Sequence, residues 1–120
     1  MLDDKVNLAE KLAAFSEHWK PKIVGYFNGN KVYVVKLQGE FVWHTHDDTD
    51  DLFLVQSGTL TMRLRDREVT IGPGELFIVP RGVEHCPYAA EETHVLVMET
   101  VTAVNTGDAG GPMTAEPEEI

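Results

Sequence analysis

The sequence has only one cysteine among its 120 residues, Cys86, and a single thiol cannot form a disulfide within the chain. The absence of a disulfide framework fits a reducing compartment, so we expect a cytoplasmic protein. A chain of this length is long enough for one domain with one sizeable core. We expect Cys86 to be a small buried hydrophobic residue of that core rather than a reactive thiol.

Positive charge and long apolar runs are also scarce. The chain carries 10 Lys and Arg against 20 Asp and Glu, a formal net charge of -10, which repels the phosphates of nucleic acids and of anionic lipid headgroups. No apolar run approaches the roughly 18 residues that span a bilayer, and the first residues are acidic where a secretory signal would be basic. We therefore expect neither a nucleic acid nor a membrane as a partner.

One amphipathic helix is predicted near the N-terminus. Its apolar residues recur every three or four positions and so share one helical face, formed by Leu8, Leu12, Phe15 and Trp19. Asn7 and Glu10 have the spacing of a capping box, and Pro21 prevents the helix from continuing. We interpret this face as a cover for the outside of the domain, and a contact between two subunits stays open as an alternative.

After Pro21 the pattern changes to short runs rich in Val, Ile, Tyr, Phe and Thr, separated by Gly, Asn, Asp and Pro, which is typical of an all-β fold. Asn28, Gly29 and Asn30 tolerate positive φ and suit a hairpin turn between the first two runs. About eight or nine such strands predict a sandwich or barrel. The predicted strands cover residues 22–27, 31–37, 41–46, 51–57, 59–65, 67–72, 75–80, 84–89 and 93–101.

The predicted organisation is an N-terminal helical arm (1–21), a barrel (22–104) and an acidic C-terminal tail rich in Gly and Pro (105–120). The tail has no apolar period, so we expect it to be extended or loosely held and to carry little of the core. Two chemically similar β blocks, around residues 39–58 and 74–89, carry the motifs of interest.

Two histidines one residue apart, His44 and His46, are the first candidate metal ligands. Side chains alternate across a strand, so both imidazoles would point to the same face, with Thr45 on the other. Imidazole nitrogens suit Zn, Fe, Ni, Cu and similar ions, and three nitrogens with one carboxylate oxygen leave positions open for water or substrate. Two histidines alone do not establish a metal site, so the spacing of the glycines and acids around them also matters.

That spacing resembles the first motif of the cupin superfamily, G-x5-H-x-H-x(3,4)-E-x6-G. Gly39 precedes His44 by one residue fewer than the motif requires, and His46 follows. After four further residues Asp51 occupies the glutamate position, and six more residues lead to Gly58. Both histidines of the motif are therefore present, and its glutamate is replaced by an aspartate.

The second cupin motif, G-x5-P-x-G-x2-H-x3-N, is also resembled. It is matched from Gly74 through Pro80, Gly82 and His85, with Ala89 where the asparagine would be. The Gly and Pro residues of this stretch predict turns that aim His85 inward. The position of Ala89 is not one of the ligand positions, so this departure leaves the predicted site intact.

The resemblance covers residues 39–89 and, with the flanking strands, most of 22–102. It implies a cupin double-stranded β-helix, that is, a jelly-roll barrel, in which the two motifs face each other and hold one divalent metal ion. By position it assigns the ligands His44, His46, Asp51 and His85, and the identity of the ion stays open among Fe, Mn, Ni and Zn. Small single-domain cupins similar to this one are often labelled mannose-6-phosphate-isomerase-like, a fold-level label that does not establish that activity.

Asp51 is the main departure from the cupin pattern. It is one methylene shorter than glutamate, so it must approach through a backbone shift, bind through water or yield its role to Asp50. A site of three histidines alone is a further alternative. The residues that receive no metal role, because they are predicted to be solvated or lie outside both motifs, are Asp47, Asp48, His18 and His94.

The resemblance implies either an enzyme or a binding module. The enzyme would be dioxygenase-like or isomerase-like and would act at the metal on a small neutral or weakly charged organic substrate, with its catalytic residue unassigned. The alternative is a non-catalytic cupin that holds a metal or a small ligand, and in both cases we expect a homodimer. A phosphosugar would need cations for its phosphate, and the arginines near the motifs are Arg63, Arg65, Arg67 and Arg81. The first three alternate along one strand and turn and are expected to point outward, which disfavours phosphosugars. The predicted walls of the substrate pocket are Tyr33, Val35, Phe53, Met62, Phe77 and Met98.

Overall fold

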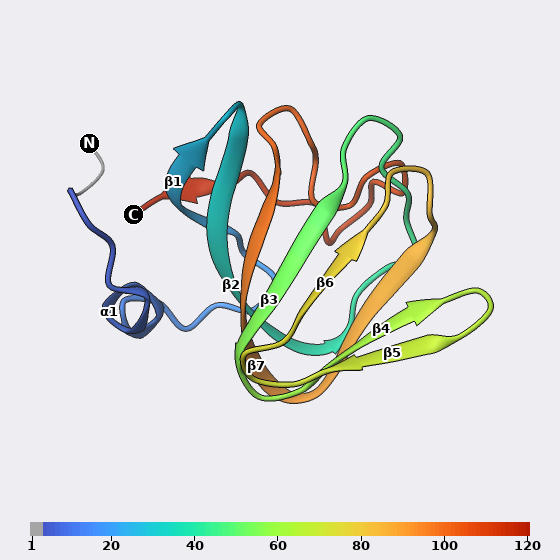
Figure 1. The fold of residues 1–120 in the computed structure, drawn as a ribbon, viewed down its shortest axis with the longest axis horizontal. Helices are drawn as coiled ribbons and strands as arrows, with labels where there is room; N and C mark the ends of the chain where they lie inside the picture. The colour runs from blue at the N-terminus through green and yellow to red at the C-terminus, as the bar shows by residue number, and fades with distance from the viewer. Residues whose placement is uncertain (1–3) are drawn as a thin grey trace.

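The fold consists of a curled β-sheet with one short helix on its outside (Figure 1), and a computed structural model describes residues 4–120 of the chain. This arrangement confirms the predicted all-β class with an N-terminal helix. No helix in the described part of the chain is long enough to cross a membrane. In chain order the elements are α1 (Leu8–Ala13), β1 (Lys22–Phe27), β2 (Asn30–Glu40), β3 (Asp51–Ser57), β4 (Leu60–Leu64), β5 (Glu68–Ile71), β6 (Leu76–Val79), β7 (His85–Thr100) and β8 (Glu118–Glu119).

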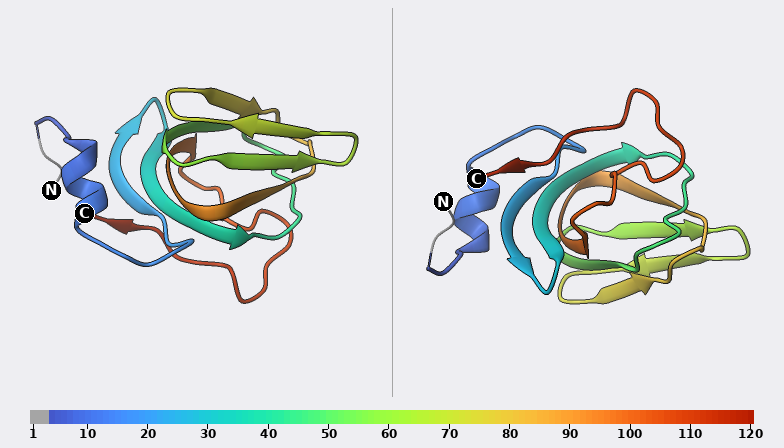
Figure 2. Two further views of the ribbon diagram at one scale, coloured as in Figure 1. Left: turned by 90° about the horizontal axis from the view of Figure 1, so that it is seen from below. Right: turned by 90° about the horizontal axis from the view of Figure 1, so that it is seen from above.

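The long strand β7 connects the two sides of the barrel. Its first residues pair with β4 and its later residues pair with β3, while β2 runs antiparallel beside most of its length. The register of β2 and β7 shifts between Leu37 and Gly39, and Gly39 has a φ of 86°. Such an irregularity bends strands and increases their twist. The sheet therefore curls around a common interior as a jelly roll, and Figure 2 shows the strands wrapped around it with α1 outside β1.

The interior is filled by apolar side chains that alternate along each strand. In β4, for example, Leu60, Met62 and Leu64 are buried and the residues between them are partly exposed. A smaller cluster on the outer face, formed around Leu12 and Val34, attaches α1 to β1 and β2. The buried residues of the main core are Ile23, Tyr33, Val35, Leu37, Phe53, Val55, Leu60, Met62, Leu64, Ile71, Val79, Ala89, Val95 and Val97. Cys86 is fully buried, as predicted.

The turn between β3 and β4 packs tightly against β7 at Gly58. This residue has a φ of 85°, and a Cβ there would lie 2.5 Å from Oγ1 and 2.9 Å from Cα of Thr93. We expect Gly58→Ala to lower the free energy of unfolding by about 2–5 kcal/mol, from the strained φ and the clash together, as measured by urea unfolding. Gly29→Ala is the matched control, because Gly29 has a φ of 78° but open space around it. It should cost only about 1–2 kcal/mol, and equal losses would contradict the clash.

The N-terminal helix is shorter than predicted. Asn7 caps its first turn by accepting a backbone hydrogen bond, as expected, but α1 ends at Ala13. The prediction that Phe15 and Trp19 continue its apolar face is therefore wrong. The carbonyl oxygen of Phe15 accepts a hydrogen bond of 2.5 Å from Nζ of Lys36 on β2, and the backbone N–H of Trp19 donates to the Lys36 carbonyl. Hydrogen bonds to β2 thus take the place of the helical hydrogen bonds that the apolar periodicity predicts for this segment.

Residues 41–50 form an irregular loop, so the predicted strand at 41–46 is wrong. Within residues 4–120, backbone-to-backbone hydrogen bonds join the loop to β7 at two points, where Phe41 donates to the Pro87 carbonyl and where His44 forms an isolated β-bridge with His85. Two contacts of this kind are too few to make a strand. The runs predicted as two strands at 84–89 and 93–101 instead form the single strand β7.

The C-terminal segment is packed against the barrel, contrary to the expectation of a loosely held tail. Thr106 is fully buried, and Oδ1 of Asp108 accepts a hydrogen bond of 2.8 Å from the backbone N–H of Thr45. The chain then crosses to β8, which pairs with β1, and Ile120 packs against the cluster around α1 (Figure 1). This segment has no regularly spaced apolar residues, because much of it is held by hydrogen bonds between polar side chains and backbone groups.

Candidate metal centre

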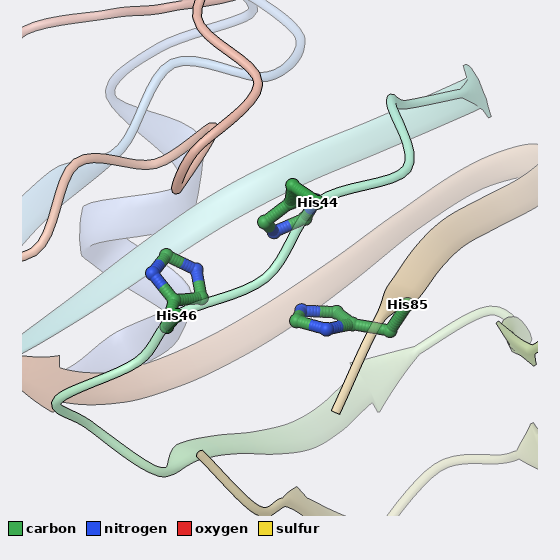
Figure 3. A group of neighbouring side chains, drawn as sticks. All are labelled: His44, His46 and His85. Atoms are coloured by element: carbon green, nitrogen blue, oxygen red, sulfur yellow. The ribbon is translucent and has the colours of Figure 1, made fainter. Parts of the chain in front are cut away.

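Three imidazole rings meet inside the barrel (Figure 3). His44 and His46 lie on the 41–50 loop and His85 begins β7, with exposed fractions of 3%, 6% and 1%. Two backbone hydrogen bonds of 3.0 Å join His44 and His85, so their ring centroids lie 4.2 Å apart. One nitrogen of each of the three rings lies within 4.8 Å of the others. The structure thus brings the three predicted histidines together, although a loop rather than a strand presents the first pair.

Backbone carbonyls fix the orientation of two of the rings. Nδ1 of His44 lies 2.8 Å from the Val42 carbonyl oxygen, and Nδ1 of His85 lies 2.9 Å from that of Val83. Because a carbonyl only accepts, each Nδ1 carries the proton and each Nε2 keeps a free lone pair. Nε2 of His85 is buried and has no hydrogen-bond partner within the described residues. A buried acceptor without a partner, on a ring held from behind, suits a metal ion.

Burial keeps His44 and His85 uncharged. It lowers the pKa of His44 to about 4, an effect to which the neighbouring His85 ring adds. It also lowers the pKa of His85. Neutral imidazole is the form that binds a metal. The two rings can therefore act as ligands at neutral pH without first losing a proton.

Asp51, at the start of β3, places a carboxylate beside the rings. Its Oδ2 lies 3.1 Å from Nε2 of His46 and 4.0 Å from Nε2 of His85, and its buried Oδ1 has no hydrogen-bond partner in residues 4–120. Asp50 is exposed and accepts hydrogen bonds from the backbone N–H and Nε of Arg81, which hold the pKa of its carboxyl below the usual value. Of the two acids considered from the sequence, Asp51 faces the imidazoles.

Glu99 is a further acid at this site, which the sequence analysis missed. It lies on β7, is 2% exposed, and its Oε2 is 4.0 Å from Nε2 of His46. Burial, reinforced by the neighbouring Asp51 carboxylate, raises the pKa of Glu99 to about 9, so it holds a proton at neutral pH. The sequence does contain a signal for Glu99. Side chains alternate across a strand, so Glu99 shares a face with the apolar Val95 and Val97, and an acid rarely lies on an apolar face.

The donor atoms fit a first-row divalent ion. With bonds of about 2.1 Å, two ligands at a right angle lie about 3.0 Å apart and two opposite ligands about 4.2 Å apart. The His46–Asp51 and His85–Asp51 separations of 3.1 Å and 4.0 Å fall in this range. Within residues 4–120, two sets of donors are close enough to hold an ion, and His46 belongs to both: His44, His46 and His85 in one, and His46, Asp51 and Glu99 in the other. Imidazole with carboxylate suits Fe, Mn, Ni and Zn alike.

A cavity of about 40 Å³ lies beside His44 and Asp51. Its walls are mostly apolar, and no lysine or arginine of the described chain lines it. Trp19, which has a φ of 61°, and Phe41 form part of the wall, with stacked rings whose centroids are 4.7 Å apart. The N-terminal arm therefore reaches the cavity, which the helix prediction did not anticipate.

Three of the six predicted pocket residues line this cavity, namely Tyr33, Val35 and Phe53. The structure places the other three elsewhere. Met62 is fully buried in the core, while Phe77 and Met98 border separate hollows elsewhere. Met98 follows the buried Val97 on β7 and so points to the outer side of the sheet.

The remaining polar residues considered from the sequence lie at the surface. His18 and His94 bond to opposite oxygens of Glu92, at 2.8 Å and 3.0 Å, and so take no part in the cluster of rings. His18 lies beyond the end of α1 rather than on the helix. The loop acids Asp47 and Asp48 are exposed, as predicted. The arginines that form surface ion pairs with acids are Arg63, Arg65, Arg67 and Arg81.

Comparisons with known proteins agree with the fold. The sequence model of the Cupin domain matches residues 31–109. A cupin-2 domain protein from Shewanella frigidimarina is 41% identical, with a TM-score of 0.78 over 79% of this chain and 93% of its own. A Neisseria meningitidis protein is 32% identical, with a TM-score of 0.75 over 81% of this chain and 99% of its own. The Bacillus subtilis protein YdbB, described as uncharacterized, is 31% identical over 77 residues, which are 63% of this chain and 62% of YdbB.

Proposed function

The chain belongs to the cupin domain family, and we propose that it binds one divalent metal ion and acts there on a small uncharged organic molecule. The proposed ligands are Nε2 of His44, His46 and His85 and the carboxylate of Asp51. The observation that carries the proposal is a set of buried donors facing one another, of which His85 Nε2 and Asp51 Oδ1 have no hydrogen-bond partner in the described chain.

The chain's own residues prepare the site for such an ion. When bound, a divalent ion acts as a Lewis acid that polarises an oxygen atom of the substrate. The carbonyls of Val42 and Val83 hold the Nδ1 protons of His44 and His85, so that Nε2 faces the centre. Asp51 contributes the negative charge, and the apolar walls of the cavity limit access of bulk water.

The cavity walls favour an uncharged substrate. Tyr33, Val35 and Phe53 offer mainly carbon, and no lysine or arginine within residues 4–120 is available in the wall to pair with a phosphate. The arginines near the motifs are paired with acids at the surface. We therefore propose dioxygenase-like or isomerase-like chemistry on a neutral molecule rather than on a sugar phosphate.

A non-catalytic metal-binding module is the second candidate, and the size of the cavity favours it. Pockets that hold a drug-sized ligand usually measure about 300–1,000 Å³, whereas this cavity measures about 40 Å³. A single water needs about 10–15 Å³. The cavity in this conformation therefore has room for an ion with a few waters, which is all that a module without turnover needs.

Metal analysis followed by activity measurement tests both candidates. The purified chain is loaded in separate samples with Fe, Mn, Ni or Zn, and we expect one ion per chain with at least one of them. The loaded protein is then given neutral phenols, aldehydes and ketones, while O2 uptake and product formation are recorded. Turnover supports the enzyme, and stoichiometric metal without any turnover supports the module. A folded chain that retains no metal would contradict both.

A further inference from the structure

Three side chains bound the cavity beside the metal centre on the side that faces solvent. Most of the residues that line the cavity are buried, and those that are partly exposed within residues 4–120 are Trp19, Phe41 and Asn105. They come from three separate stretches, namely the N-terminal arm, the 41–50 loop and the C-terminal segment. A molecule that is too large for the cavity must therefore displace one of these three side chains in order to lie there.

Asn105 is a fixed part of this rim. Its Nδ2 donates a hydrogen bond of 3.0 Å to the Met113 carbonyl oxygen, and its Oδ1 accepts one of 2.9 Å from the backbone N–H of Ala115. Both ends of the amide are thus used within the C-terminal segment. Moving Asn105 would break two hydrogen bonds at once and disturb the segment that they hold together.

The two aromatic side chains of the rim form a row with a proposed metal ligand. The rings of Trp19 and Phe41 are stacked, with centroids 4.7 Å apart. The Phe41 ring meets the His44 ring edge-on, with centroids 5.4 Å apart. Phe41 is thus enclosed between the indole and the imidazole, and Trp19 lies at the end of the row away from the ligand. Trp19 is therefore the ring that can leave without moving His44.

Two hydrogen bonds to β2 hold Trp19 beside the cavity. Its backbone N–H donates to the Lys36 carbonyl oxygen at 2.8 Å, and its Nε1 donates to the Gln38 carbonyl oxygen at 2.9 Å. Its φ of 61° is a conformation that bulky residues rarely adopt. Such strained positions persist only where the surroundings impose them, and they cluster at active sites and ligand clamps. Here the strained backbone places a large ring at the edge of the cavity.

We propose that Trp19 is a specificity-determining residue, which sets the upper size of the molecule that can lie beside the metal ion. The inference rests on the proposed function and narrows its substrate class to small neutral molecules. With the indole in place the cavity measures about 40 Å³, which is room for a few non-hydrogen atoms, since one water needs about 10–15 Å³. A larger molecule must break the hydrogen bond of the indole to Gln38 and its stack on Phe41.

Two neutral metal ligands of different size test the inference on the Co²⁺-loaded chain. Imidazole is the small one, and 4-phenylimidazole carries an additional phenyl ring; the visible spectrum of Co²⁺ reports the binding of each. Trp19→Gly removes the ring while glycine keeps the positive φ without strain. We expect the ratio of the Kd for 4-phenylimidazole to that for imidazole to fall by about 10–100-fold in Trp19→Gly, because the larger ligand no longer breaks a hydrogen bond and an aromatic stack.

A measurement on the metal-free chain separates this inference from the proposed function. Loss of the indole leaves an apolar gap, and an engineered apolar cavity can bind an aromatic molecule. Added indole should therefore raise the Tm of metal-free Trp19→Gly by at least about 2 °C, as followed by circular dichroism. It should not raise the Tm of the metal-free unchanged chain, whose own indole fills the gap.

Phe27→Ala is the matched control, because Phe27 is a 59% exposed aromatic residue of β1 that does not line the cavity. It should match the unchanged chain in both measurements. If Trp19→Gly does not fold, Trp19→Ala replaces it. An unchanged Kd ratio in the variant without the indole would overturn the inference, and so would an equal rise in Tm in the unchanged chain. If the folded chain binds no Co²⁺ or other divalent metal, the proposed function fails, and the indole measurement decides whether Trp19 closes the cavity.

Discussion

Replacing His46 by alanine is expected to abolish metal binding. His46 belongs to both sets of donor atoms that are close enough to hold an ion, so its removal breaks both. We expect the Kd for Zn²⁺ to rise by more than about 100-fold, because loss of a mere hydrogen-bonding partner of a ligand already costs 10–100-fold. Elemental analysis after gel filtration should find metal only at background level in this variant.

His94→Ala is the control for the His46 experiment. His94 is also a histidine that accepts or donates through Nε2, but its partner is Glu92 and it lies outside the cluster of rings. This variant should retain as much metal as the unchanged chain. The metal-free His46→Ala chain should also unfold at lower urea, since Asp51 loses its 3.1 Å partner, at a cost of about 1–3 kcal/mol. Unchanged metal content in His46→Ala would remove His46 from the site.

Gly107→Ala is expected to damage the site from a residue that is not a ligand. Gly107 has a φ of 54°, and a Cβ there would press on the Thr45 carbonyl oxygen and lie 3.1 Å from Cδ2 of His44. Thr45 is the residue between the two histidines, and Asp108 holds it by accepting from its N–H and donating to its carbonyl. The added methyl group must therefore displace the loop that presents both rings. We expect a loss of metal affinity of about 10–100-fold and a loss of stability of about 2–5 kcal/mol.

Gly110→Ala separates the effect of crowding from that of backbone strain. Gly110 has a φ of 61°, close to that of Gly107, but a Cβ there would meet nothing within 4 Å. It should cost about 1–2 kcal/mol in urea unfolding and leave the metal affinity unchanged. If Gly107→Ala binds Zn²⁺ as tightly as Gly110→Ala does, the C-terminal segment does not shape the site.

Much of the site could be predicted from the sequence, because the metal-binding motifs are local patterns. His44 and His46 are two residues apart, and His85 follows a stretch rich in Gly and Pro that turns the chain. The three rings were therefore predicted together even though the strand expected at 41–46 is a loop. The spacing of side chains along an extended backbone was enough, since a loop can present alternate residues to the same side as a strand does.

Other parts of the site depend on contacts between residues far apart in the chain, and for these a local pattern gives at most the face of a strand on which a residue lies. Glu99 reaches His46 because β7 lies beside both β2 and β3 in the closed barrel. Trp19 joins the cavity wall because a lysine of β2 bonds the arm at a point where the periodicity predicts a helix. Thr106 is buried without an apolar period around it. Each of these placements is decided by tertiary hydrogen bonds or burial rather than by local propensity.

The packing of residues 107 and 108 against Thr45 has a consequence for the order of events during synthesis. The ribosome makes His44 and His46 about 60 residues before Gly107 and Asp108, an interval of about 3–12 s at 5–20 residues per second. Throughout that time the ligand loop lacks the segment that holds it in its final shape. Under the proposed function, the ion is therefore expected to bind in its final geometry only after residues 107 and 108 have been made.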